Sequence, residues 1–223
     1  MIWLWIGLAV VVGVPVVLGG LQLLALGSAK VRRLEDAKSE LPIGQASREI
    51  GSAFLDRSGF RFVGAYEVST LLGTPVAVMW QHGDEATYLA VLLVGESVNT
   101  DIVSILSWER GIGVTTSTAR DGHTVPKPPT AWLQSFSGRT TAVLWDKHQQ
   151  AEAALADHYG VMPEAVTLDP GDVLEQSVRR DAKHVLSHPW LLLAVAWRFW
   201  IGRFLLHNKP VTARLPRRRA SAV

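Results

Sequence analysis

Residues 2–26 read IWLWIGLAVVVGVPVVLGGLQLLAL and contain no charged side chain. An α-helix rises about 1.5 Å per residue, so this stretch would extend roughly 37 Å, which exceeds the roughly 30 Å hydrocarbon core of a bilayer. This length predicts an uncleaved transmembrane anchor over residues 1–29. A cleaved signal peptide is the alternative, because small residues follow at positions 27–29. However, no basic residue precedes the stretch, and signal sequences have shorter apolar regions.

The charges on the two sides of this stretch predict its orientation. Lys30, Arg32 and Arg33 follow it, whereas no basic residue precedes it. Because basic flanks stay in the cytoplasm, we expect a protein that crosses the plasma (inner) membrane once, with its N-terminus outside and its remaining residues in the cytoplasm. Trp3 and Trp5 would then lie at the outer interface, where amphipathic rings collect.

Composition limits the remaining possibilities. The chain has 223 residues, a formal net charge of +2 and no Cys. This length accommodates the anchor and one further domain. The absence of Cys agrees with a reducing compartment and excludes thiol catalysis and thiolate metal sites. Basic residues are concentrated in a tail at residues 208–223, and a nucleic-acid partner would require a basic face on the domain, so we expect none.

A charged neck at residues 30–42 leads into the domain, which we place at residues 43–187. It opens with a short amphipathic helix at residues 43–55. Apolar alternation and short turns then predict an antiparallel meander. Its strands are expected at residues 60–66, 74–81, 87–94, 101–108 and 112–117. An irregular, proline-containing crossing at residues 120–129 follows.

Two helices complete the predicted domain. The first covers residues 139–159, and the second begins at Asp169 and Pro170, a capping residue followed by a first-turn proline. The buried face of the first helix is expected to hold Leu144, His148, Ala151 and Leu155. Helices packed on one face of an antiparallel sheet give an α+β fold.

A second apolar stretch, at residues 190–206, is interrupted by Arg198 and Arg203. Two central arginines cost about 5–7 kcal/mol on membrane insertion, whereas the apolar residues return about 3–5 kcal/mol. We therefore predict an interfacial helix at residues 188–207, whose arginines contact the anionic headgroups of the lipid bilayer. Two alternatives remain open for this stretch. It could form a helix that spans the membrane, or a helix that packs on the domain or on another protein. The residues expected at the membrane interface are Trp3, Trp5, Lys30, Arg32, Arg33, Trp190, Trp197, Arg198, Trp200, Arg203, Arg217, Arg218 and Arg219.

One group of residues has metal-ligand spacing. His184 and His188 stand four residues apart on a predicted helix, and Asp181 precedes them by one turn. This spacing resembles the HExxH arrangement, but Val185 occupies the position of its glutamate. We therefore predict no metal and no cofactor, and interpret the two histidines as a pair that faces either solvent or lipid headgroups.

Three further residues are weak catalytic candidates. His148 falls on the apolar face of its helix, where a core histidine is the simpler interpretation. Asp121 and His123 lie in the irregular crossing, where loops can carry sites but where Asp and Gly are also ordinary turn residues. No nucleophile elbow, dinucleotide fingerprint or phosphate-binding loop accompanies them.

The order of features resembles uncharacterised bacterial membrane-anchored proteins of the single-pass type. The resemblance rests on the strand end VTTS at residues 114–117, the proline-containing crossing, the helix with His148, and the late Trp/Arg-rich segment that ends NKP at residues 208–210. It implies the architecture described above and no activity.

These observations lead to three hypotheses about function. The first is a membrane-anchored interaction or scaffold protein without enzymatic chemistry, which binds a protein partner. The second is a small membrane-anchored enzyme or ligand sensor, in which Asp121, His123 and His148 converge in a cleft between sheet and helix. The third is an accessory subunit of a larger membrane complex.

Overall fold

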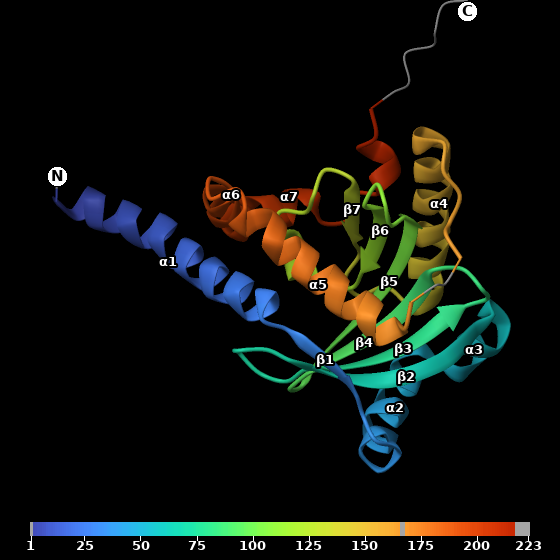
Figure 1. The fold of residues 1–223 in the computed structure, drawn as a ribbon. Coiled ribbons are helices and arrows are strands. Elements are labelled where there is room, and N and C mark those ends of the chain that lie inside the picture. Colours follow the sequence, from blue (N-terminus) through green and yellow to red (C-terminus); the bar gives the residue numbers. More distant parts are fainter. Residues whose placement is uncertain (1, 166–167, 217–223) are drawn as a thin grey trace, which may run out of the picture.

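A seven-stranded mixed sheet forms the centre of the molecule, and the chain has an α+β fold. The computed structural model describes residues 2–165 and 168–216 (Figure 1). The strands lie in sequence order across the sheet. They are β1 (Lys30–Arg33), β2 (Phe60–Ser69), β3 (Val76–His82), β4 (Thr87–Val94), β5 (Ser97–Ser107), β6 (Ile112–Ser117) and β7 (Ala131–Ser135).

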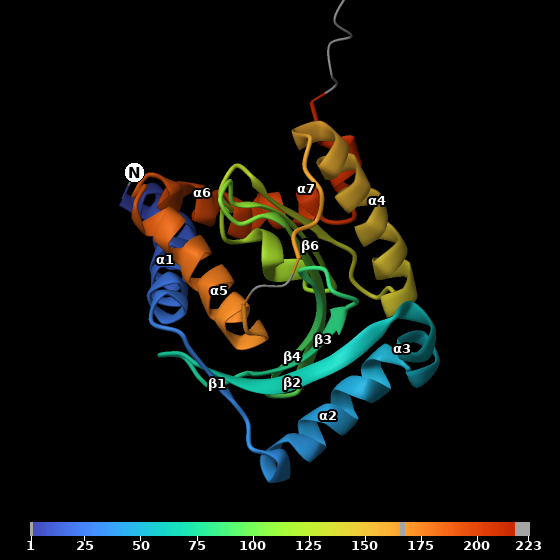
Figure 2. The ribbon, with the colours of Figure 1, turned by 45° about the vertical axis from the view of Figure 1, so that its right-hand side comes forward.

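The strands from β1 to β6 form antiparallel pairs. Short turns join β2 to β6 in succession, whereas α2 and α3 connect β1 to β2. Shifts in register at Phe62/Gly64 and at Ile105/Ser107 interrupt this pairing. Such bulges bend a strand and increase its twist. Figure 2 shows the sheet curving around one helix, α5 (Pro170–Leu186).

β7 pairs with β6 in parallel, so the sheet is mixed and the prediction of a purely antiparallel sheet was wrong. A parallel neighbour requires a crossover connection, and the crossing between β6 and β7 provides it. It contains one 3₁₀ turn, η1 (Arg120–His123).

Helices cover both faces of the sheet, which corrects the prediction that they pack on one face (Figure 2). On one face lie α2 (Asp36–Ile50), α3 (Ser52–Ser58) and α4 (Thr141–Tyr159). α5 lies on the other face. The reason is the composition of the central strands: in β3, Val78 and Trp80 point toward α2 and α4, while Ala77 and Met79 point toward α5. A strand that is apolar on both sides must be covered on both sides.

The neck and the first helix also differ from the prediction. Residues 30–33 form the edge strand β1, and α2 starts at Asp36 and includes Pro42 instead of starting after it. Gly51, with a φ of 86°, separates α2 from α3. In contrast, α5 begins as predicted, because the Asp169 carboxylate accepts a hydrogen bond from the Gly171 backbone at 2.7 Å.

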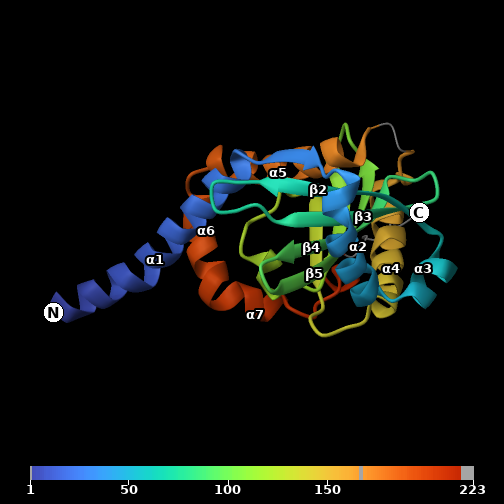
Figure 3. The same ribbon diagram turned by 90° about the horizontal axis from the view of Figure 1, so that it is seen from below.

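The C-terminal elements are α6 (Leu191–Trp197), the π-helical segment η2 (Arg198–Gly202), α7 (Arg203–Leu206) and the 3₁₀ turn η3 (Val211–Ala213). The C-terminal end of the N-terminal helix α1 (Ile2–Gly27) lies beside α5 and α6 (Figures 1 and 3). α1 and α6 run antiparallel. Near the end of α1, Gly27 faces Ala182 of α5, and Gly19 faces Val195 of α6. Further toward the N-terminus, the Trp200 indole N–H donates to the Val11 carbonyl at 2.6 Å.

The predicted transmembrane anchor was wrong. Across residues 2–165 and 168–216, no helix combines the length and the apolar character that crossing a membrane requires. The predicted single-pass topology is therefore wrong as well. The same applies to the predicted orientation, with the N-terminus outside and the domain in the cytoplasm. Part of the apolar content of α1 serves protein packing instead, since Leu23 and Ala25 are buried and Leu23 joins Val185 and Val195 in one cluster.

Candidate functional site

His148 on α4 is the centre of a buried polar network between α4 and the sheet. Its side chain is fully buried. Its Nε2 lies 2.8 Å from the Ser104 hydroxyl of β5, and its Nδ1 lies 2.9 Å from the Thr116 hydroxyl of β6. Ser104 also contacts Thr87 at 2.7 Å and the Glu152 carboxylate, one turn further along α4. Gln134 of β7 donates to Thr116 at 2.8 Å.

One arrangement of protons satisfies every one of these contacts. Glu152 can only accept, so the Ser104 hydroxyl donates to it and in turn accepts from His148 Nε2–H and from Thr87. At the other nitrogen, Thr116 accepts from Gln134 and donates to Nδ1. The network is therefore consistent with a neutral imidazole protonated at Nε2.

Burial and hydrogen bonding set the charges of the network. Burial lowers the pKa of His148, although the Glu152 carboxylate opposes this effect. For Glu152, burial acts to raise the pKa, but the nearby His148 and the hydrogen bond from Ser104 outweigh it, so the pKa is lowered. At neutral pH the network thus holds one neutral histidine and one carboxylate.

This network stabilises the fold and lacks the geometry of a Ser-His-acid triad. In such a triad the acid orients the imidazole from the nitrogen opposite the nucleophile. Here Glu152 lies on the same side as Ser104, and Thr116 occupies the opposite nitrogen. Ser104 is fully buried, so no substrate reaches its hydroxyl.

The structure does not bring the three catalytic candidates together. His123 belongs to η1, which packs against Leu133, since Gly122 of the same turn faces that side chain. The neighbouring Gln134 points the opposite way, toward Thr116 and the Lys147 carbonyl of α4. Successive residues of a strand face opposite sides of the sheet, so His123 and His148 lie on opposite faces. The side chain of Asp121 lies outside the described residues.

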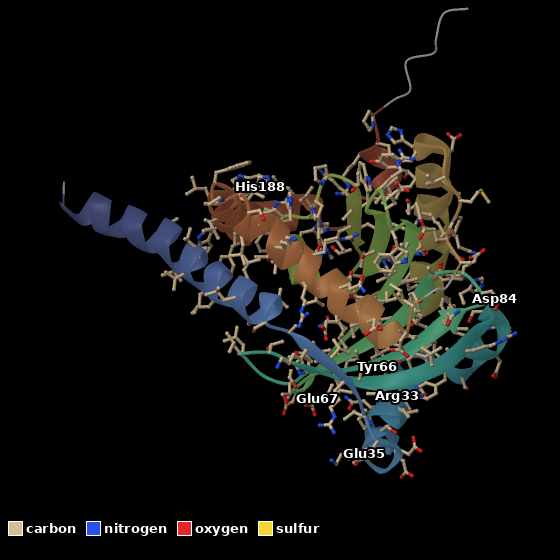
Figure 4. All side chains as sticks on the ribbon, in the orientation of Figure 1. Arg33, Glu35, Tyr66, Glu67, Asp84 and His188 are labelled. Carbon is tan, nitrogen blue, oxygen red and sulfur yellow. The ribbon has the colours of Figure 1, made fainter. Side chains whose placement is uncertain are left out.

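The metal candidates do not assemble into a metal site, although the rings of His184 and His188 lie next to each other with centroids 5.1 Å apart. Asp181 forms an ion pair with Lys127. The Nδ1 of His188 lies 2.8 Å from the His184 backbone carbonyl and donates to it. Figure 4 places His188 where α5 meets α6. Within residues 2–165 and 168–216, no cluster of histidines and carboxylates has the form of a metal site.

Exposed apolar side chains gather on α1 and on the adjoining C-terminal helices. Trp190 and Leu193 are each 64% exposed, and Val17 of α1 is 60% exposed. We call the whole set the helical apolar surface. Its members are Val11, Val14, Val17, Leu18, Leu21 and Leu24 on α1, and Trp190, Leu193, Trp197, Trp200, Ile201, Phe204 and Leu205 toward the C-terminus.

The residues expected at a membrane interface do not share one environment. Lys30, Arg32 and Arg33 are exposed on the edge strand β1. Arg198 is half-buried and donates to the Val125 carbonyl at 3.5 Å, so it faces the protein. The side chains of Trp3, Trp5 and Arg203, and the tail residues Arg217, Arg218 and Arg219, lie outside the described residues.

Sequence reasoning identified His148 as a core histidine but missed its partners. A signal existed in the spacing of His148 and Glu152, which places both on one face of a helix. Ser104, Thr116 and Gln134 carried no comparable signal, because isolated polar residues in strands usually face solvent.

No known protein family, curated protein or solved structure matches this chain. The resemblance to uncharacterised bacterial proteins therefore stays a prediction, and the site geometry alone supports the function proposed next.

Proposed function

We propose that this protein is a non-enzymatic interaction protein that binds an apolar helix of a partner protein through its helical apolar surface. The observation that carries the proposal is the gathering of exposed tryptophan, leucine and valine side chains on helices that pack against each other. Large exposed apolar patches mark interaction sites. Tryptophan in particular is enriched among the residues that contribute most to binding.

A groove next to this surface supports the same proposal. It lies between the end of α1 and the turn that joins β2 to β3, and its volume is about 490 Å³. Its apolar lining includes Leu26, Leu72, Pro75 and Val94. A helix lying along α1 could place side chains in this groove, in the manner of helix-in-groove recognition.

The alternative of an enzyme built from Asp121, His123 and His148 loses its support, because the two histidines lie on opposite faces of the sheet. The accessory-subunit hypothesis is one form of the present proposal, in which the partner stays bound permanently. Both forms require that burying the helical apolar surface drives association.

Site-specific photo-crosslinking in the native cell tests the proposal. A photoreactive amino acid replaces Leu21 on α1 in one variant and Leu193 on α6 in another, and crosslinked products are identified by mass spectrometry. We expect both positions to capture the same protein.

Leu41 provides the matched control, because it is 87% exposed but lies on α2, away from both the helical apolar surface and the groove. Capture of one protein from Leu21 and Leu193 but not from Leu41 supports the proposal. If Leu41 captures the same products, or if the two surface positions capture no protein, the helical apolar surface is not a protein interface.

A further inference from the structure

We propose that a pocket between η1, β7 and the C-terminal segment binds a phosphate group, through His123, Lys127, Arg198 and Arg214. The ligand class is inorganic phosphate or the phosphomonoester of a small molecule. This site is separate from the helical apolar surface, and the inference does not depend on the proposed interaction function.

The pocket is assembled from distant parts of the chain. η1 contributes His123, the following crossing contributes Lys127, η2 contributes Arg198, and the chain after η3 contributes Arg214. Trp132 and Leu133 of β7 add apolar walls, and the volume is about 180 Å³. A single water molecule occupies about 30 Å³ in the liquid, so a phosphate group fits with room for a small substituent.

The charges that line the pocket are all of one sign. None of the described lining residues is an Asp or a Glu. Lys127 reaches Asp181 of α5, whereas Arg198 and Arg214 contact backbone carbonyls, those of Val125 and Leu133. Burial lowers the pKa of both arginines, and the charge of Arg198 lowers that of Arg214 further. Among the described side chains, neither arginine has a carboxylate partner. Partly buried cations in that situation are costly, and an anion between them would remove that cost.

Within the described part of the chain, two atoms of the pocket residues have no hydrogen-bond partner. These are Nε2 of His123 and Nε of Arg214, and both atoms are buried. Buried polar groups are nearly always satisfied in native proteins, so each exception requires an explanation. A phosphate provides several acceptor oxygens, which would satisfy Arg214 Nε–H and an Nε2–H tautomer of His123. His123 itself is 2% exposed, so bulk water is a poor substitute.

The backbone around the pocket holds the two arginines in place. Arg198 is the first residue of the π-helical segment, and such wide helical turns occur frequently at functional sites. Gly202 closes that segment, and a Cβ there would lie 2.5 Å from the Trp197 ring. On the other side, the Val211 backbone donates to the Gln134 amide at 2.9 Å, which ties the segment carrying Arg214 to the His148 network.

Phosphate explains this arrangement better than other ligand classes. Metal cations require carboxylate, imidazole or carbonyl ligands, and the guanidinium and ammonium groups here repel them. The planar guanidinium group of an arginine can donate two parallel hydrogen bonds to two phosphate oxygens, and the lysine ammonium adds a compact positive charge.

Isothermal titration calorimetry of the full-length protein with inorganic phosphate tests the inference, at constant ionic strength with chloride as the reference anion. Glycerol 3-phosphate and a short-chain phosphatidic acid below its micelle concentration are titrated in parallel, to separate free phosphate from phosphomonoester and lipid sources. We expect saturable binding of at least one of these ligands. The same ligand should raise the melting temperature.

Three pocket variants and one control make the test specific. Arg198→Gln, Arg214→Gln and His123→Gln should each weaken binding at least tenfold, whereas Arg61→Gln, an exposed arginine on β2, should leave it unchanged. Arg198→Gln should also keep or raise the melting temperature of the ligand-free protein, because it removes repulsion from Arg214. The melting temperature thus distinguishes a variant that no longer binds the ligand from a variant that no longer folds.

Two results would overturn the inference. One is the absence of saturable binding for all three ligands. The other is an equal loss of binding in the Arg61 control and in the pocket variants that remain folded.

Discussion

At the scale of single residues, the clearest feature is the satisfied network around His148. Each hydroxyl and each imidazole nitrogen has a partner, from Gln134 at one end to Glu152 at the other. Removing one member leaves others without partners, and an unsatisfied buried group costs about 1–3 kcal/mol. The network thus acts as a unit that fixes α4 on the sheet.

We predict that His148→Leu lowers the free energy of unfolding by about 2–4 kcal/mol, because it leaves both Ser104 and Thr116 without an imidazole partner. Urea denaturation followed by circular dichroism measures the effect. Ser137→Ala is the matched control: it removes a hydroxyl that contacts His207 at 3.0 Å in a half-buried position, and it should cost less than about 1 kcal/mol. Equal effects of the two variants would show that the network contributes no more than a surface contact.

A second prediction at this scale concerns pH. Burial lowers the pKa of His148, and burial together with the nearby Arg214 and Arg198 lowers that of His123 to about 4. The unfolded chain takes up these protons near pH 6.5, whereas the folded chain does not. Stability is therefore full above pH 6.5 and falls as the pH drops toward 4, by about 1.4 kcal/mol per pH unit for each such group.

Urea unfolding at pH 7.5, 6.0 and 5.0 measures this slope. The variant His123→Gln should show a shallower dependence than the wild type, because one of the two groups is removed. A stability that stays constant or rises between pH 7.5 and pH 5.0 would contradict the assignment of these histidines as buried and neutral.

At the scale of elements, the contact between α1 and α6 decides how the N-terminal helix is used. Gly19 allows α6 to approach closely, since a Cβ there would lie 2.4 Å from a methyl carbon of Val195. At the next residue, Gly20, none of the described atoms outside the backbone of α1 and the adjacent residues lies within 4 Å of the same position. Two adjacent glycines of one helix thus have opposite roles.

This difference predicts opposite effects for a matched pair of variants. Gly19→Ala should lower the free energy of unfolding by about 1–3 kcal/mol through overpacking. Gly20→Ala should leave it unchanged or raise it by up to about 1 kcal/mol, because alanine favours the helix. Thermal unfolding of the two variants side by side checks the prediction, and a loss of stability in Gly20→Ala would show that α1 packs in another orientation.

At the scale of the whole molecule, the sequence predicted the parts more successfully than their arrangement. Strands β2 to β6 and helices α4 and α5 were predicted near their actual bounds, because turn residues, caps and apolar periodicity are local signals. β7 was missed, since its pairing with β6 depends on a crossover and not on its own composition. Likewise, the sequence shows that Arg198 and Arg214 are charged, but their positions beside His123 depend on the tertiary fold.

The same limit explains the wrong prediction for α1. An apolar run shows that a helix avoids water, but it does not show what covers the helix. Here Leu23 is buried against Val185 and Val195, a contact that spans most of the chain and leaves no local pattern. The exposed residues of the same helix, such as Leu21, carry the proposal of a partner.

The most direct test of this central claim is quantitative mass spectrometry of the proteins that co-purify with the tagged full-length chain. Three forms are compared: the wild type, the double variant Leu21→Asp/Leu193→Asp, and the control Leu41→Asp. We expect one protein in stoichiometric amount with the wild type and the control, and its loss from the double variant. A wild type that retains no stoichiometric protein, or a double variant that retains it fully, would show that the helical apolar surface does not bind a partner.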